Sequence, residues 1–141
     1  MAGFSATRES SGLSPELEEL AERVIGAAIE VHRHLGAGLP ESVCRNALSH
    51  ELSLREIRHV CEAPLPVMYK GKHVGEGRMD ILVDGKLVVE LKVVEDINDV
   101  HVAQCIAYLV AGEYQLALLI NFNVSLLKNG IHRVIRSGIL R

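Results

Sequence analysis

The sequence predicts a single α/β domain in which a mixed β-sheet is flanked by helices. Two helical segments come first, three apolar stretches separated by turn residues follow, and another helical segment precedes two further apolar stretches. Because parallel strands need a long crossover, the strand after this later helix is expected to lie parallel to one of the earlier strands. With 141 residues, 48% of them hydrophobic, the chain suits one compact domain.

Two helices are expected near the N-terminus. Ser14 can cap the first helix, and apolar residues recur at three- and four-residue steps until Gly36 ends the pattern. A second helix is expected over residues 40–54. Residues 1–13 lack the pattern of a signal peptide and are expected to be a flexible lead before the domain, which is expected to span residues 14–141.

The rest of the chain is expected to form strands and one further helix. Short apolar stretches broken by turn residues are typical of strands, and Gly112 ends the returning helical spacing. The pattern predicts a three-stranded meander, a helix, a buried strand and a closing strand, at residues 59–69, 73–83, 86–94, 98–112, 114–122 and 130–135. The expected order of elements is therefore α-α-β-β-β-α-β-β.

Composition argues against several classes of protein. A net charge of -3 lacks the basic excess of a protein that binds nucleic acid through phosphate contacts alone. Three cysteines without a CxxC pair argue against a disulfide framework and against a cysteine zinc site. No apolar run approaches the roughly 20 residues of a membrane span, so we expect no membrane partner and a cytoplasmic location.

Basic residues are scattered along the sequence. They could make a local rim for nucleic acid, or they could simply solvate the surface. The residues are Arg45, Arg55, Arg58, Lys70, Lys72, Arg78 and Lys128. Aromatic residues are only 4% of the chain, which does not support a base-stacking platform. Phosphate and metal contacts would therefore dominate any binding of nucleic acid.

Two charges interrupt the apolar run of residues 86–94. Glu90 and Lys92 stand in a stretch of the kind that central strands show. Taking either charge out of water would cost several kcal/mol unless it were paired. Two alternatives remain open at this point: a site that pairs or solvates the charges, or an edge strand that turns them toward solvent.

Asp80 is another carboxylate that enters an apolar stretch, one strand earlier. A two-residue turn at 84–85 would pair Asp80 with Val89 and put Glu90 on the opposite face of the sheet. A loop of odd length, or a bulge, would bring the two carboxylates to one face. We therefore predict an irregular or three-residue hairpin over residues 84–86.

Paired carboxylates on a rigid sheet suit Mg²⁺, which takes one or two carboxylates and keeps several waters; Mn²⁺ could substitute for it. Such a metal neutralises charge that develops on phosphorus and lowers the pKa of a bound water. Lys92 projects from the same strand face as Glu90 and could position or help deprotonate the attacking water, or stabilise the developing charge. These residue types would suit metal-assisted attack of water on a phosphate group.

Short motifs follow one another in an order seen in a known superfamily. They are GRMD at 77–80, VELK at 89–92 and QCIAY at 104–108. Their Gly-x-x-Asp, Glu-x-Lys and Gln-x-x-x-Tyr order resembles that of RecB-like members of the PD-(D/E)XK nuclease superfamily. GLPESVC at 38–44 also resembles the signature of the small bacterial GxxExxY proteins of that superfamily. The resemblance covers about residues 24–135 and implies a restriction-endonuclease-like core.

The resemblance implies a role for the matching residues on the strands. Asp80, Glu90 and the backbone carbonyl of Leu91 would bind the metal. Lys92 would be the catalytic lysine.

Helical residues take further roles by the same resemblance. Glu41 corresponds to a glutamate that commonly contacts the metal or its water, and Gln104 and Tyr108 match a motif that usually supports the site or the nucleic-acid backbone. Cys44 departs from the family pattern, because the GxxExxY signature has tyrosine there; we expect Cys44 to be a small packing residue. His101 lies one helical turn before Gln104, and we expect it to face solvent rather than the site.

Together the motifs predict a metal-dependent nuclease that hydrolyses nucleic-acid phosphodiester bonds through Mg²⁺-activated water, with DNA as the expected partner. One alternative is a nuclease-fold binding or regulatory module without turnover, acting as a homodimer or with a partner. The acidic net charge, the small size and Cys44 favour that alternative. A purely structural role is a third alternative, and it would need four motifs to arise in order without a site behind them.

Overall fold

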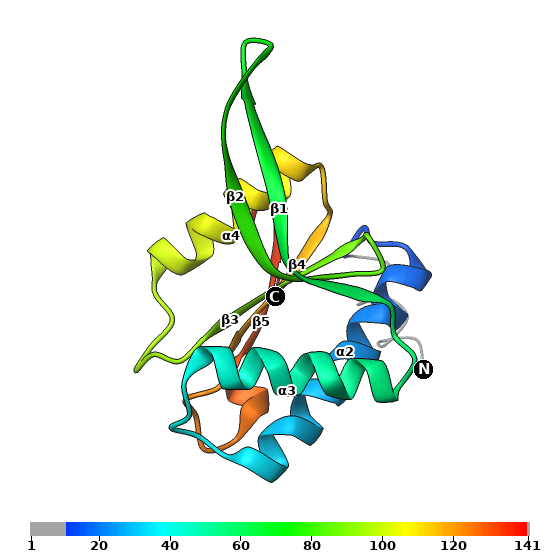
Figure 1. The fold of residues 1–141 in the computed structure, drawn as a ribbon, viewed down its shortest axis with the longest axis vertical. Helices are drawn as coiled ribbons and strands as arrows, with labels where there is room; N and C mark the ends of the chain where they lie inside the picture. Colours follow the sequence, from blue (N-terminus) through cyan, green and yellow to red (C-terminus); the bar gives the residue numbers. More distant parts are fainter. Residues whose placement is uncertain (1–10, 141) are drawn as a thin grey trace.

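The computed structural model describes residues 11–140, and it has the mixed sheet with flanking helices that the sequence predicts (Figure 1). Residues 1–10 of the expected flexible lead lie outside the described residues. Six strands form one sheet in the order β1-β2-β3-β4-β5-β6. They are β1 (His59–Tyr69), β2 (Lys72–Val83), β3 (Leu87–Lys92), β4 (Leu116–Asn121), β5 (Ile131–Ile135) and β6 (Gly138–Ile139).

The strand pairings confirm the predicted meander and crossover. Strands β1, β2 and β3 are antiparallel neighbours, whereas β3 and β4 are parallel and are joined through a helix. The pattern did not predict β6, a two-residue strand that pairs with β5. Strand β3 ends at Lys92 rather than at the predicted residue 94, because the backbone N–H of Val94 donates to the side chain of Asn121 (3.2 Å).

Within residues 11–140, three α-helices and one 3₁₀ turn accompany the sheet: α2 (Pro15–Leu35), α3 (Glu41–Leu54), α4 (Asp99–Gly112) and η1 (Leu127–Gly130). Ser14 caps α2 as predicted, since its side chain accepts a hydrogen bond from the backbone N–H of Leu17 (3.2 Å). Gly36, with φ 71°, ends the helix. None of the described helices is long and apolar enough to cross a membrane.

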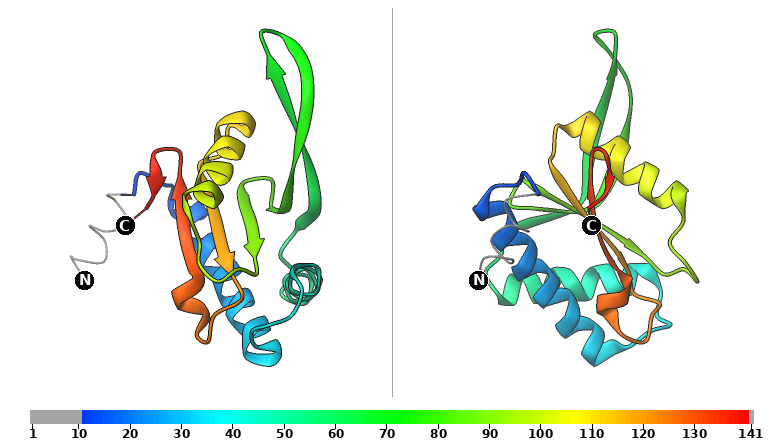
Figure 2. Two further views of the ribbon diagram at one scale, coloured as in Figure 1. Left: turned by 90° about the vertical axis from the view of Figure 1, so that its left-hand side faces the viewer. Right: turned by 180° about the vertical axis from the view of Figure 1, so that it is seen from behind.

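The helices cover the two faces of the sheet (Figure 2). Helices α2 and α3 pack on one face, against residues such as Val89 and Leu118. Helix α4 packs on the other face through Cys105 and Leu109. All six residues of β4 are buried, which explains why its first five residues are apolar without alternation, and Asn121 at its end is a buried polar residue.

The β2–β3 hairpin has the three-residue connection that we predicted. Its last pair is Val83 with Leu87, so residues 84–86 form the loop. In this register Asp80 and Glu90 come opposite one another and share a face of the sheet. The hairpin therefore meets the geometric condition for a shared carboxylate site.

Strand β2 leaves β3 at this point and continues with β1 alone. The ladder between β2 and β3 ends at Ile81 and Val89, whereas β1 and β2 stay paired as far as Tyr69 and Lys72. We call the part of this ribbon over residues 63–79 the β1–β2 arm. Its base rests on α4 and its outer half projects beyond the rest of the molecule (Figures 1 and 2). The divergence leaves Glu90 beyond the last paired residues of β2 and β3.

Candidate active site

Asp80 and Glu90 are tied together across the divergence of β2 and β3. The backbone N–H of Asp80 donates to Glu90 Oε1 (3.2 Å), and the backbone N–H of Leu91 donates to Asp80 Oδ2 (2.7 Å). These two hydrogen bonds lie directly beyond Ile81 and Val89, the last residues of β2 and β3 that are paired through their backbones. The structure thus brings the two predicted carboxylates to one point at the carboxyl end of β3.

Burial decides between the two alternatives that the sequence left open for Glu90. Strand β3 is central, between β2 and β4, and Glu90 is only 3% exposed. The edge-strand alternative is therefore wrong. Burial, followed by the negative charge of Asp80, raises the pKa of Glu90 to about 9. The metal-free pair therefore holds a proton near neutral pH, because two adjacent carboxylates resist a second charge.

The donor set of this pair suits a hard divalent cation, which prefers carboxylate and carbonyl oxygens. In a strand, the N–H and C=O of one residue point toward the same neighbour. Since the N–H of Leu91 points at Asp80, its carbonyl faces the same side of β3, toward β2. A cation there would replace the proton that burial and repulsion impose on Glu90. The oxygen atoms of Asp80, Glu90 and the Leu91 carbonyl therefore fit a hard divalent cation such as Mg²⁺.

Lys92 lies beside this pair, on the face of β3 that α4 covers. Its Nζ donates to Gln104 Oε1 (3.2 Å), which joins the predicted strand and helix residues. Its positive charge lowers the pKa of Glu90, although burial and Asp80 outweigh it. Lys92 therefore affects the protonation of Glu90 through its charge, while its ammonium contacts the side-chain amide of Gln104 on α4.

The segment after Lys92 is fixed by a residue that the sequence reasoning did not select. Asn121 is 2% exposed; its Oδ1 accepts from the N–H of Val94 (3.2 Å) and its Nδ2 donates to the Val94 carbonyl (2.9 Å). The N–H of Phe122 also donates to the Lys92 carbonyl (2.9 Å). Asn121 therefore holds the chain just beyond the lysine. The sequence offered one signal for this role, namely a side-chain amide among the apolar residues of 116–122, because a buried amide needs hydrogen-bond partners.

Glu41 occupies the first turn of α3, as predicted. Burial and then the charge of Asp80 raise the pKa of Glu41, whereas Lys92 and Arg45 act in the opposite direction. Glu41 is therefore electrostatically coupled to the pair. Among residues 11–140, however, no three His, Cys, Asp or Glu side chains are grouped so as to hold a metal ion. The structure brings Glu41 near the site without making it a third carboxylate of a cluster.

Tyr108 packs against the base of the β1–β2 arm. A Cβ built on Gly77 would lie 2.8 Å from Cε1 of the Tyr108 ring, so only a residue without a side chain leaves room for the ring. Gly77 is the glycine of the GRMD motif and Tyr108 is the tyrosine of the QCIAY motif. Their contact gives a physical reason for the two motifs to occur together: α4 supports the strand that carries Asp80.

This contact predicts strong coupling between Gly77 and Tyr108. We expect Gly77→Ala to lower the free energy of unfolding by about 1–3 kcal/mol, because the added methyl overpacks against the ring. In a Tyr108→Ala background the same change should cost far less, with an interaction energy of about 0.5–3 kcal/mol. Urea unfolding of the four proteins measures this cycle. Equal costs of Gly77→Ala in both backgrounds would contradict the contact.

Other residues considered from the sequence have structural roles. His101 Nδ1 accepts from the backbone N–H of Asn98 (3.0 Å) and completes a capping box at the start of α4, so the ring does more than face solvent. Cys44 is 1% exposed in the core under α2 and α3, which confirms its expected packing role. Cys105 is buried on the face of Glu90, and burial raises its pKa to about 12, so its thiol stays protonated.

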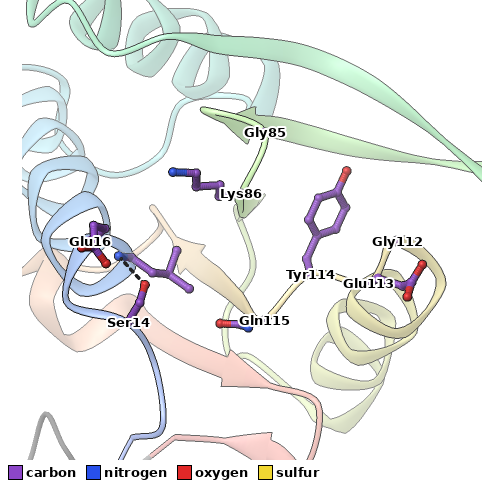
Figure 3. A pocket seen from close by; sticks show the side chains of 9 residues that line it. Ser14, Glu16, Gly85, Lys86, Gly112, Glu113, Tyr114 and Gln115 are labelled. Carbon is purple, nitrogen blue, oxygen red and sulfur yellow. Dashed lines mark hydrogen bonds between the residues drawn. The ribbon is translucent and has the colours of Figure 1, made fainter.

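A cavity of about 630 Å³ lies at the other end of β3 (Figure 3). Its lining includes Lys86 and Gln115, which directly precede β3 and β4, together with Tyr114 and the start of α2. None of its lining residues belongs to the carboxylate and lysine set. In open α/β sheets, ligands bind beyond the carboxyl ends of the parallel strands, and this is where Lys92 lies. This cavity is therefore separate from the carboxylate and lysine set.

The fold and the site define the class of protein. A sheet with helices on both faces carries an aspartate, a buried glutamate and a lysine where its central strands diverge. A sequence profile of the PD-(D/E)XK nuclease superfamily matches residues 18–134. The chain belongs to this superfamily, and its architecture agrees with the restriction-endonuclease-like core that the resemblance implied. Comparisons with curated proteins and with solved structures gave no match.

Proposed function

We propose that this protein is a metal-dependent nuclease that hydrolyses phosphodiester bonds of DNA. The observation that supports it best is the pair of Asp80 and Glu90, joined by backbone hydrogen bonds at the divergence of β2 and β3, with Lys92 beside it. Membership of a nuclease superfamily supports a nucleic-acid substrate, and its members generally use divalent metals. The resemblance of the GLPESVC segment to the GxxExxY signature supports the further proposal that the chain is one of the GxxExxY proteins.

In the proposed site, Asp80, Glu90 and the Leu91 carbonyl hold Mg²⁺ or Mn²⁺. When bound, the cation supplies positive charge for the phosphate oxygens and lowers the pKa of the attacking water. Lys92 donates hydrogen bonds to the attacking water or to the phosphate and stabilises negative charge that develops there. Gln104 holds the lysine ammonium in place through its Oε1 (3.2 Å). Glu41 accepts a hydrogen bond from water at the edge of the site, close enough for Asp80 to raise its pKa.

Metal binding and cleavage test this proposal together. Mg²⁺ and Mn²⁺ are titrated calorimetrically into the wild-type protein and into Asp80→Asn, and both proteins are assayed on labelled single- and double-stranded DNA and RNA. We expect wild-type cleavage that requires the metal, and we expect Asp80→Asn to lower both metal affinity and the cleavage rate by at least about 10²-fold.

Asp84→Asn is the matched control, because Asp84 lies in the β2–β3 loop and forms an ion pair with Arg58 (2.7 Å) away from the site. We expect it to retain wild-type binding and cleavage. Carboxylate-dependent metal binding without cleavage of any substrate would favour the alternative, a nuclease-fold binding module. Cleavage that survives Asp80→Asn would exclude the proposed mechanism.

A further inference from the structure

The tip of the β1–β2 arm, which we define as residues 68–74, combines apolar and basic side chains. Met68, Tyr69 and Val74 are 57%, 61% and 55% exposed, and Lys70 and Lys72 are exposed between them. The sequence has no acidic residue from position 63 to position 75, although the whole chain carries a net charge of -3. The arm tip is therefore a local positive and apolar surface on an acidic protein.

The tip lysines differ from other members of the predicted basic rim. Arg55 pairs with Glu51 (2.7 Å), and Arg58 pairs with a carboxylate of the β2–β3 loop (2.7 Å). Arg78 also faces a carboxylate (3.6 Å). Within residues 11–140 the tip lysines form no ion pair, and the Nζ of Lys70 lies over the Tyr69 ring, 5.4 Å from its centre. Their charges remain available to a partner.

The turn itself holds a lysine where another residue would be favoured. Tyr69 pairs with Lys72, so Lys70 and Gly71 form a two-residue turn, with φ of 47° and 81°. Such turns favour Asn-Gly, and a residue with a Cβ in this left-handed region costs about 1 kcal/mol. The turn therefore keeps a charge at its apex at a conformational cost.

The exposed edge of the arm is poorly suited to pairing with another chain. Strand β1 is at one edge of the sheet, and it carries Pro64 and Pro66, both exposed. Because proline has no N–H to donate, prolines on an edge strand prevent a further strand from completing a ladder. This argues against dimerisation through strand addition as the role of the arm.

The dimensions of the arm suit a DNA groove. A two-stranded β-ribbon fits the major groove of B-DNA, whereas the major groove of A-form RNA is too deep and narrow. Lys72 lies eight residues before Asp80 on β2, which is a reach of about 26 Å at about 3.3 Å per residue. This is less than one turn of DNA, about 34 Å. One duplex could therefore contact the arm tip and the carboxylates together.

We propose that the β1–β2 arm is a DNA-binding element, which lies along a groove of duplex DNA and contacts phosphates through Lys70 and Lys72. This inference rests on the proposed nuclease function and adds to it the element that grips the duplex away from the cleaved bond. Tyr69 and Met68 contribute apolar contacts to the sugar and base edges, and the arm adds no metal ligand.

The salt dependence of binding tests this proposal. The probe is a fluorescein-labelled DNA duplex of mixed sequence, about 24 base pairs or roughly two turns long, titrated in EDTA between about 50 and 200 mM salt. The test variant is Lys70→Asn with Lys72→Gln, because Asn-Gly favours this turn and the arm should keep its fold. The control, Arg23→Gln with Lys86→Gln, removes two positive charges near the β2–β3 loop, at the other end of β3.

We expect the tip variant to bind the duplex several-fold more weakly. The magnitude of its slope of log affinity against log salt should fall by about 1.8, since each lost phosphate contact removes about 0.9. The control should retain the wild-type slope, and an RNA duplex of the same sequence should show a smaller change. Equal slopes for the tip variant and the control, or an equal loss on RNA, would overturn the proposal.

Two further results separate this proposal from its alternatives. A concentration-dependent dimer in sedimentation velocity that the tip variant abolishes, with unchanged DNA binding, would assign the arm to self-association and overturn a DNA role. If only the proposed nuclease function fails, the wild-type protein shows no metal-dependent cleavage, but the tip variant still lowers the slope of log affinity against log salt. If the arm proposal fails, cleavage persists and the slopes of the two variants agree.

Discussion

Lys92→Met should lower the rate of metal-dependent cleavage by about 10³-fold, within the range for loss of a proton-transfer group or of one electrostatic contact at a reacting centre. The positive charge of Lys92 acts on the buried pair, since it lowers the pKa of Glu90, and methionine preserves the approximate length of the side chain without the charge. The loss should fall mainly on kcat rather than on KM, because in the proposed mechanism the lysine acts on charge that develops during the reaction. Single-turnover assays at saturating metal measure it.

Lys86→Met is the matched control for this change. Lys86 lies in the loop before β3, 60% exposed and 3.8 Å from Asp84, so its ion pair contributes little. We expect wild-type cleavage from this variant. Urea unfolding should show that both variants remain folded. If Lys92→Met cleaved as fast as Lys86→Met, Lys92 would have no catalytic role.

Glu90→Gln should change how the stability of the metal-free protein depends on pH. The pKa of Glu90 is raised from 4.5 to about 9 in the folded protein, by burial and then by the charge of Asp80. The folded state therefore binds the Glu90 proton more tightly than the unfolded state does. This contribution to stability is fully present below about pH 4.5 and is lost as pH rises toward 9, by at most about 1.4 kcal/mol per pH unit.

Glutamine is neutral at every pH, so Glu90→Gln removes this dependence. We expect the free energy of unfolding of the metal-free variant to exceed that of the wild type by an amount that grows from pH 5 to pH 9. Mg²⁺ should stabilise the wild type more as pH rises, since the cation competes with the proton, and should stabilise the variant little. Urea unfolding across this pH range, with and without Mg²⁺, measures both effects.

Glu19→Gln provides the control for the pH experiment, because Glu19 is exposed on α2. We expect its stability to follow the wild type at every pH. If the difference in free energy of unfolding between wild type and Glu90→Gln stayed constant from pH 5 to pH 9, it would contradict the buried, protonated state of Glu90. Loss of the Mg²⁺ effect in Glu19→Gln as well would contradict a specific metal site.

Local pattern was enough to predict much of this protein. Helix and strand patterns predict the spacing of apolar residues in α2, its cap at Ser14 and the five apolar residues that begin β4. These predictions need no knowledge of distant neighbours. The three-residue β2–β3 loop followed from requiring Asp80 and Glu90 to share a face. Each of these inferences uses residues that are close in sequence.

Tertiary structure decided what depends on contacts between distant elements. Only packing shows that Glu90 is 3% exposed in a central strand, that Gly77 makes room for Tyr108, and that Asn121 holds the segment after β3. The strands diverge because β2 leaves β3 to continue with β1, which frees the edge beside Glu90 and extends the arm. The sequence by itself determined which chemical groups are present. The packing of distant elements decided which of these groups meet, because the neighbours of a side chain on a sheet depend on strand register and on the helices that cover the sheet.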